Sequence, residues 1–298
     1  HGVRIRHRKM LASMILGVAG LNSLTFGPGS LELRLMTAKL AARNGGDAAL
    51  YAGPDEKTQR RWRSLMYGKE YGAADADAPG CARVMTTVED LGASLSAAEA
   101  LVLVCDTAPL EQSALDTLFN NAGDDLRRVV LISKMGVTRA KPAGPFGLGG
   151  GDAAIAAGEA ALRKATSARD GLDLSIIRVG TLKGGGPGAA EGGELGLSQL
   201  YYDGIVDLTT YMTTQSYDKF TNGAKVLRGD PCDLANPLLR AGRASSFDPF
   251  EDEASRIVAA AAAVHAMTHP AAVELTVSAA SGELPPTQAE WAELFEQI

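Results

Sequence analysis

The sequence is short of aromatic residues, of cysteine and of long hydrophobic runs, and each shortage excludes a class of protein. Phe, Trp and Tyr make up only 5% of the chain, which favours close packing of helices on a sheet. The three cysteines, at Cys81, Cys105 and Cys232, lack the spacing of a metal site, so reduced thiols are expected. The uncharged apolar run at 10–21 is too short to cross a bilayer, which takes about 20 residues.

Charge and size indicate a globular protein that does not bind nucleic acid. The formal net charge is -6 at pH 7, and no basic patch with interleaved aromatic residues occurs in the body of the chain. With 298 residues, 46% of them hydrophobic, the chain can bury one large α/β core, or one core with a sizeable insertion. We find no internal repeat with a period of about 20 to 50 residues.

The rest of the chain is arranged around the stretch at 22–44. A short apolar run leads into Gly-Pro-Gly-Ser and then into a helical pattern with Ser30 at the N-cap position. The apolar residues of that pattern share one helical face, at Leu33, Met36 and Leu40. The next apolar run, Ala48–Tyr51, completes a strand, helix and strand of the kind that holds a dinucleotide diphosphate in Rossmann folds.

The glycines of this turn match the dinucleotide motif only in part. Gly27 and Gly29 fill the first two places of Gly-x-Gly-x-x-Gly, but Glu32 stands in the third. A carboxylate suits the positive end of a helix, yet it repels a diphosphate by about 4 kcal/mol at a partly shielded surface. Two interpretations stay open: a phosphate cradle formed by Gly27, Gly29 and Ser30, or a tight turn with ordinary helix capping.

The end of the second strand is where a dinucleotide-binding protein carries the group that binds the adenosine ribose. Ala52 and Gly53 stand at that place, and Asp55 follows after a proline. Asp55 is therefore either a displaced ribose ligand or an ordinary turn aspartate.

Further along, apolar runs alternate with helical patterns. Strands are predicted at 83–87, 100–105, 127–133, 174–179 and 273–277, and helices at 110–122 and 153–165, with Asp152 as a cap. Such alternation, with strands rich in Val, Ile and Leu, predicts an α/β protein with a doubly wound, parallel, Rossmann-like sheet. We expect one domain over 22–298 with an insertion at 184–252.

Two segments interrupt the alternation. Residues 1–21, basic and then apolar, resemble a targeting signal, and we favour an arm that docks on a partner or a membrane surface over a helix of the domain's own core. Within the insertion, 184–196 is rich in glycine and predicts a loop. A helical face of core residues is predicted next, at Tyr201, Ile205, Leu208 and Met212. The remainder of the insertion is predicted to be irregular surface structure.

The order of several motifs resembles a known family. The runs are VVLISKMGV at 129–137, GEAALR at 158–163, GLDLSIIRVG at 171–180 and the ending PPTQAEWAELF. Together they resemble the atypical short-chain dehydrogenase/reductase group, of the NmrA-like NAD(P)-binding kind, over 22–183 and 253–298. The run YYDGIVDL of the insertion is similar to plastid members of that group from algae.

The resemblance implies a chemistry whose residues are only partly present. The family uses a serine after the fifth strand and a Tyr-x-x-x-Lys pair on the following helix, which moves a hydroxyl proton and holds the nicotinamide ribose. Ser133 matches the serine, and Lys134 stands where a second serine is common. Alignment along the helix places Gly151 and Ile155 at the tyrosine and lysine positions, so the acid–base pair is absent. Arg178 matches the arginine of an Arg-Pro-Gly turn, and either reaches a ligand or braces a loop.

Three hypotheses for function follow. The first is a non-catalytic or weakly catalytic Rossmann protein, a subunit or assembly factor of a larger, photosynthetic-membrane complex, with 1–21 and 184–252 as its contact surfaces. The second is an NAD(P)H-dependent reductase that uses Ser133 and Lys134. The third is a sensor that binds NADP(H) without turnover. The expected cofactor is accordingly none or NADP(H), and the expected location is the plastid, in the stroma or at the thylakoid.

Overall fold

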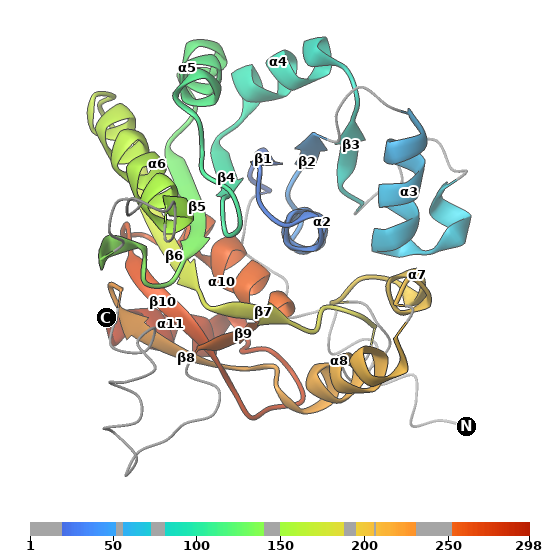
Figure 1. The fold of residues 1–298 in the computed structure, drawn as a ribbon. Helices are drawn as coiled ribbons and strands as arrows, with labels where there is room; N and C mark the ends of the chain where they lie inside the picture. The colour runs from blue at the N-terminus through green and yellow to red at the C-terminus, as the bar shows by residue number, and fades with distance from the viewer. Residues whose placement is uncertain are drawn as a thin grey trace, which may run out of the picture.

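A twisted sheet of eight strands forms the centre of the molecule (Figure 1). The structure, a computed structural model, describes residues 20–51, 56–72, 81–139, 150–187, 195–205, 207–230 and 252–298. The strand order is β3-β2-β1-β4-β5-β6-β10-β8, parallel throughout except for β8, which pairs antiparallel with β10. The strands are β1 (Ser23–Phe26), β2 (Ala48–Tyr51), β3 (Arg83–Met85), β4 (Ala100–Val104), β5 (Arg128–Lys134), β6 (Asp173–Val179), β8 (Gly223–Arg228) and β10 (Glu274–Ala280).

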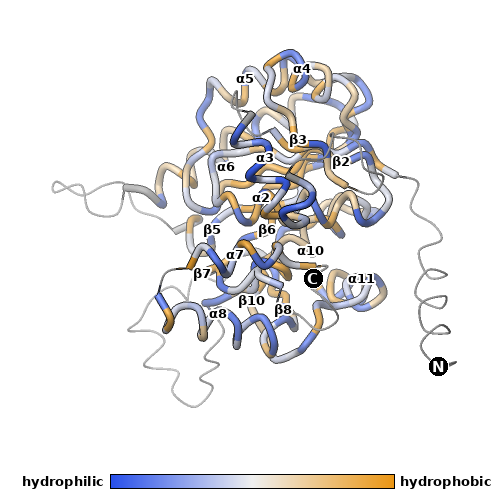
Figure 2. The backbone as a smooth tube through the Cα atoms, turned by 90° about the vertical axis from the view of Figure 1, so that its right-hand side faces the viewer, coloured by the Kyte–Doolittle hydropathy of each residue, from blue (hydrophilic) through white to orange (hydrophobic). Residues whose placement is uncertain are grey.

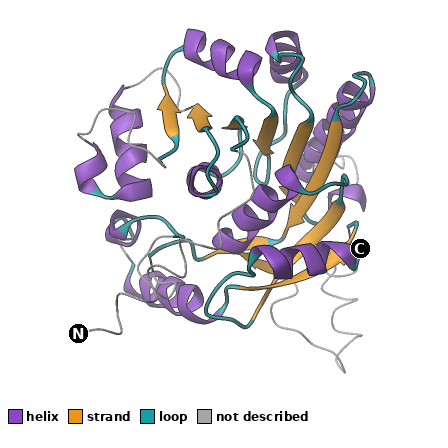
Figure 3. Ribbon diagram, turned by 180° about the vertical axis from the view of Figure 1, so that it is seen from behind, coloured by secondary structure: helices purple, strands orange, loops and turns teal. Residues whose placement is uncertain are grey.

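Helices cover both faces of the sheet (Figures 1 and 3). One face packs against α2 (Leu31–Arg43), α3 (Glu56–Tyr67), α10 (Arg256–Thr268) and α11 (Gln288–Glu296). The opposite face packs against α4 (Val88–Ala97), α5 (Gln112–Asn121) and α6 (Gly150–Ser167). Two short 3₁₀ helices lie at Lys69–Gly72 and Val137–Arg139. This arrangement confirms the predicted doubly wound α/β fold.

The core explains why the central strands read as continuous apolar runs. All five residues of β4 are buried, as are the first six residues of β5, because parallel strands in this fold are covered on both faces. Figure 2 shows the hydrophilic stretches mostly in the outer helices and loops, away from these strands. Leu33, Met36 and Leu40 are buried against the sheet, as their spacing predicts.

The segment from 181 to 255 contains more regular structure than the helical face predicted at 201–212. Short helices α7 (Gln199–Asp203) and α8 (Leu208–Phe220) lie below α2 and α3 in Figure 1. The predicted irregular remainder instead includes part of α8 and the strand β8, which forms the edge of the main sheet. Strands β7 (Thr181–Lys183) and β9 (Glu253–Ser255) add a separate two-stranded parallel sheet.

The predicted core face at 201–212 is wrong in its second half. Tyr201 and Ile205 are half-buried, but Leu208 and Met212 lie on the next helix with exposed fractions of 70% and 62%. The chain turns between α7 and α8, so a single helical face does not continue through this stretch. The predicted N-terminal arm lies outside the described residues except for Gly20 and Leu21. No described helix has the length and apolar character needed to cross a membrane.

Candidate functional site

The strand order places a crevice at the carboxyl ends of β1 and β4. Chain connections run outward in opposite directions from these two neighbours, and this is where open α/β sheets bind ligands. A cleft of about 680 Å³ opens there, and we call it the strand-end cleft. Residues that line it come from the first turn, from the ends of β4, β5 and β6, and from α6, and they include Ser30, Asp106, Lys134, Gly180 and Ile155.

The turn between β1 and α2 is tight and passes close to β4, as its glycines suggest. Gly27 has a φ of +132°, and a Cβ at this residue would lie 2.3 Å from the carbonyl oxygen of Val104. The backbone N–H of Gly29 donates to the same oxygen at 2.8 Å. Gly27 and Gly29 are therefore needed by the turn itself, since the first requires a left-handed backbone and both pass close to β4.

A carboxylate that the sequence did not single out lies at the start of α2. The Oδ1 atom of Asp106 accepts a hydrogen bond from the backbone N–H of Ser30 at 2.8 Å. A Cβ at Gly29 would lie 2.3 Å from the same Oδ1 atom. Asp106 directly follows β4 and is only 8% exposed. It occupies the helix N-terminus, where backbone N–H groups would otherwise bind a phosphate.

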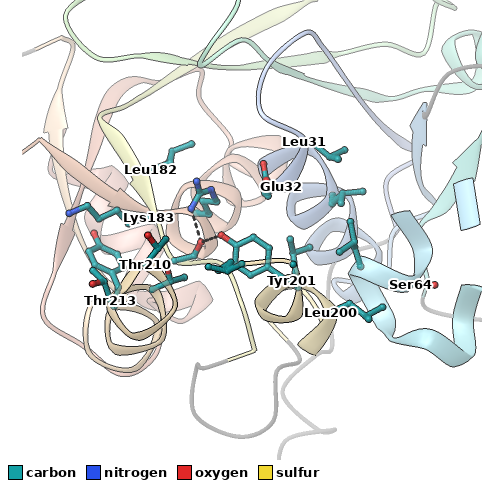
Figure 4. A pocket seen from close by; sticks show the side chains of 18 of the residues that line it. Leu31, Glu32, Ser64, Leu182, Lys183, Leu200, Tyr201, Thr210 and Thr213 are labelled. Atoms are coloured by element: carbon teal, nitrogen blue, oxygen red, sulfur yellow. Dashed lines mark hydrogen bonds between the residues drawn. The ribbon is translucent and has the colours of Figure 1, made fainter. Parts of the chain in front are cut away.

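The structure adds two facts about this helix end. Ser30 is at the N-cap position, but its side chain makes no cap hydrogen bond, and its buried Oγ has no partner among the described residues. The carboxylate that is hydrogen-bonded at the helix N-terminus is that of Asp106, which the glycine motif does not include. Glu32 instead lines a second cavity, beside Leu31 and Tyr201 (Figure 4). The separation in sequence between Ser30 and Asp106 explains why local motifs missed their contact.

The predicted catalytic candidates, Ser133 and Lys134, have side chains in different environments. Ser133 is fully buried, and its Oγ has no hydrogen-bond partner in the described part of the chain. Lys134 lines the strand-end cleft, where its Nζ lies 2.6 Å from Oδ1 of Asp152. Asp152, predicted as a cap, lies inside the first turn of α6 and is the partner of this lysine. Both side chains of the pair are 45% exposed.

One of the two positions of the missing acid–base pair lines the cleft. Ile155, at the lysine position of the family pattern, is buried and lines the strand-end cleft. Gly151, at the tyrosine position, lies one turn earlier on the same helix. Among the described residues that line this cleft, none is a tyrosine. The site therefore offers Lys134 and Asp152 as its proton-bearing pair on this side.

Arg178 is held in a buried ion cluster away from the strand-end cleft. Its guanidinium donates to Glu159 at 2.6 and 3.1 Å and to Glu274 at 2.8 Å, and Asp230 lies 3.9 Å away. Burial opposes the charge of Arg178, but the hydrogen bonds and charges of Glu159 and Glu274 outweigh it and raise its pKa. Of the two interpretations of Arg178, the structure shows the bracing one, because the side chain is fully buried and fully engaged.

The other candidate residues add little chemistry to the site. Asp55 lies outside the described residues. Cys105 is buried beside Asp106, and burial, with the charges of Asp106 and Glu159, raises the pKa of its thiol to about 12. Within the described ranges, no three His, Cys, Asp or Glu side chains are grouped to hold a metal ion.

Comparison with known proteins finds similar solved structures at low sequence identity. The chain matches no protein-family model and no curated protein. It is similar to a short-chain dehydrogenase/reductase from Veillonella parvula, with 12% identity, coverage of 89% of this chain and 99% of that chain, and a TM-score of 0.45. It is also similar to a UDP-N-acetylglucosamine 4-epimerase from Methanobrevibacter ruminantium (12% identity, 89% and 79% covered, TM-score 0.47). A third similar structure is yeast methylglyoxal/isovaleraldehyde reductase complexed with NADPH (9% identity, 85% and 74% covered, TM-score 0.48).

The fold is Rossmann-like. Its strand order and the helices on both faces of the sheet carry this conclusion. The Asp106 carboxylate already accepts the Ser30 N–H at the helix N-terminus, so a dinucleotide diphosphate bound there would lie beside a fixed negative charge. Two anions at about 4 Å repel by about 4 kcal/mol at a partly shielded surface.

Proposed function

We propose that this chain is a Rossmann-like protein without hydride-transfer activity, which acts through its surface as a subunit or assembly factor of a larger complex. The observation that carries the proposal is the Asp106 carboxylate at the N-terminus of α2, hydrogen-bonded to the N–H of Ser30 at 2.8 Å. A diphosphate would have to displace this internal anion and take over its hydrogen bond. At the helix N-terminus, the protein itself thus supplies the negative charge that a diphosphate would supply in the enzymes of this fold.

The strand-end cleft supports the same proposal. A reductase of the implied kind needs a hydroxyl that gives a proton and a lysine that lowers its pKa. Ile155 stands at the lysine position, and Ser133 is buried with no access to the cleft. Lys134 remains, but its Nζ is paired with Asp152. None of these contacts positions a proton donor over a substrate carbonyl.

Apolar side chains on the outside of α8 support a role for the surface. Leu208, Met212 and Phe220 are exposed by 70%, 62% and 60%. They follow one ridge of the helix at spacings of four and eight residues, and exposed apolar patches on soluble proteins mark contact sites. We propose that a protein partner binds both this ridge and the arm at 1–21. The plastid location remains part of this proposal.

A titration with NADPH and NADH tests the first half of the proposal. The protein is followed by coenzyme fluorescence and then assayed for oxidation of NADPH with a panel of aldehydes and ketones. We expect no binding at micromolar concentrations and no turnover. Micromolar binding with turnover would instead identify a reductase, and binding without turnover would identify a sensor. The reductase alternative keeps some support because the strand-end cleft is open and contains Lys134.

Size-exclusion chromatography of native extracts tests the second half. The tagged full chain is expected to elute in a large complex, and Leu208→Ser, Met212→Ser and Phe220→Ser together should shift it to the monomer position. Val88→Ser on α4 is the matched control, because Val88 is similarly exposed at 67% on the opposite face of the sheet. Elution of the unmodified chain as a monomer would contradict the subunit proposal.

A further inference from the structure

A second cavity, of about 710 Å³, lies beside the first half of α2. Its walls come from α2, α3, α7, α8 and β7, and we call it the α2–α8 cavity. Figure 4 shows Leu31 and Leu200 on one side, Lys183, Thr210 and Thr213 on the other, and Tyr201 between them. Among the residues that the structure describes, the cavity shares Leu182 and Arg256 alone with the strand-end cleft. Its volume falls in the range of about 300 to 1,000 Å³ that is typical of sites for small molecules.

The lining combines an apolar wall with a row of hydroxyl groups. The apolar wall consists mostly of leucine side chains, including Leu31, Leu35, Leu65 and Leu200. The hydroxyls come from α8, at Thr209, Thr210, Thr213 and Thr214, and that of Thr210 already donates to Asp207 at 2.7 Å. An apolar lining with few polar groups is the usual composition of a small-molecule site, in which the polar groups fix the orientation of the ligand.

The charges in the cavity leave one cation in excess. Lys183 is already paired with Glu253. The other charged side chains in the lining are Arg61, Arg256 and Glu32, and none of the three forms an ion pair with a described residue. Among the described lining residues two arginines stand against one carboxylate, an excess of one positive charge, and Asp218 outside the lining interacts with the charge of Arg256. The lining therefore suits a ligand with one negative charge and does not suit a diphosphate.

Arg256 is the group best placed to receive that charge. Its Nη1 donates to the carbonyl oxygen of Gly184 at 2.7 Å, and its buried Nε has no partner among the described residues. It is the first residue of α10, so the positive end of that helix adds to its charge. The nearby Asp218 carboxylate is already bound by the N–H groups of Gly185 and Gly186.

We infer that the α2–α8 cavity binds a small amphipathic monoanion, a carboxylate with an apolar body, with its charge at Arg256 and its apolar part against the leucines of α2 and α3. This inference is independent of the proposed role as a subunit, because none of the three ridge residues, Leu208, Met212 and Phe220, lines the cavity. The inference also does not depend on whether a dinucleotide binds near Asp106, because Asp106 does not line this cavity.

A series of eight-carbon ligands with different head groups tests the inference. Octanoate, octanol and octylammonium are titrated into the full chain by isothermal calorimetry. We expect octanoate to bind about tenfold more tightly than octanol, because a hydrogen bond to a charged group contributes about 1.5 kcal/mol or more. Octylammonium should bind more weakly than either. Equal affinity for the three ligands, or no binding of octanoate, would overturn the inference.

Two variants locate the site. Arg256→Met should reduce octanoate binding to the level of octanol, whereas Arg228→Met, an exposed arginine on β8, should leave it unchanged. Thr213→Trp should fill the cavity and abolish binding of both ligands, whereas Thr117→Trp, exposed on α5, should not. Thr209→Trp replaces Thr213→Trp if the latter does not fold. Octanoate binding that survives both cavity-filling variants would place the ligand elsewhere and overturn the assignment.

Discussion

The Oδ1 atom of Asp106 and the backbone N–H of Ser30 are joined by a hydrogen bond of 2.8 Å across 76 residues of sequence. The bond ties the end of β4 to the start of α2, and it satisfies one of the N–H groups that a helix leaves without an internal partner. The same carboxylate lies at the positive end of the helix. Asp106 therefore supplies the negative charge and the hydrogen-bond acceptor that a bound anion supplies in other proteins of this fold.

Two replacements of Asp106 should destabilise the protein to different extents. Asp106→Asn keeps a hydrogen-bond acceptor but loses the charge, which should lower the free energy of unfolding by about 0.3 to 1 kcal/mol. Asp106→Ala also leaves the Ser30 N–H unsatisfied, for a loss of about 1 to 3 kcal/mol. Unfolding in urea measures both values. Asp125→Ala, at an exposed position, is the control, and an equal loss there would contradict a specific role for Asp106.

The Asp106→Ala variant should also acquire an anion site. Its helix N-terminus regains free N–H groups, which bind phosphate in many proteins. We therefore expect inorganic phosphate to raise the thermal unfolding temperature of Asp106→Ala and to leave the unmodified protein unchanged relative to chloride at the same ionic strength. The same increase in both proteins would show that the carboxylate does not occupy the anion position.

Ser133 and Ser175 provide a matched pair on neighbouring strands. Both are fully buried, but Oγ of Ser133 has no described partner, whereas Oγ of Ser175 accepts from the N–H of Val273 at 3.2 Å. Burial of an unpartnered hydroxyl costs about 1 to 3 kcal/mol, so Ser133→Ala should be neutral or stabilising. Ser175→Ala should be destabilising by about 1 kcal/mol. Urea unfolding compares them, and a large loss from Ser133→Ala would reveal a hidden partner.

Sequence patterns predicted the parts of the fold whose signal is local. Strand β4 was predictable because all its residues are buried, so the whole run is apolar. Strand β8 was not, because none of its residues is fully buried and two of them, Lys225 and Arg228, carry charge. An edge strand of this kind lacks the alternation that identifies strands in sequence.

The candidate site was less predictable than the fold. The altered glycine motif correctly directed attention to the start of α2, and the alignment on α6 correctly placed Ile155 at the cleft. The carboxylate itself was assigned to Glu32, because the motif concerns consecutive residues. Asp106 reaches this place only through the pairing of β1 with β4. A contact between residues so far apart in the sequence depends on the register of the sheet.

Removal of the Arg178 charge should be strongly destabilising. Its guanidinium is fully buried and bound by Glu159, which is itself only 5% exposed. Arg178→Met leaves a buried carboxylate without its partner, a change that costs about 3 to 5 kcal/mol. Arg163→Met is the control, because Arg163 pairs with Glu274 at 2.8 Å but is 44% exposed. That pair should contribute about 1 kcal/mol or less, and equal losses would contradict the role of burial.

His265 should make the stability of the protein sensitive to mild acid. Its ring is 7% exposed and packs against Phe295, with ring centroids 4.9 Å apart, and Nδ1 lies 3.1 Å from Oε1 of Gln288. Burial, with the charge of His269, lowers the pKa of His265 below 6.5 despite the hydrogen bond to Gln288. The unfolded chain then binds a proton that the folded chain excludes, so stability is complete above pH 6.5 and falls as the pH decreases through the folded pKa. Urea unfolding at about pH 7.5 and about pH 5.5 should show this loss in the unmodified protein and in His269→Gln. His265→Gln should show a smaller loss, and an equal loss would mean that other groups titrate in this range.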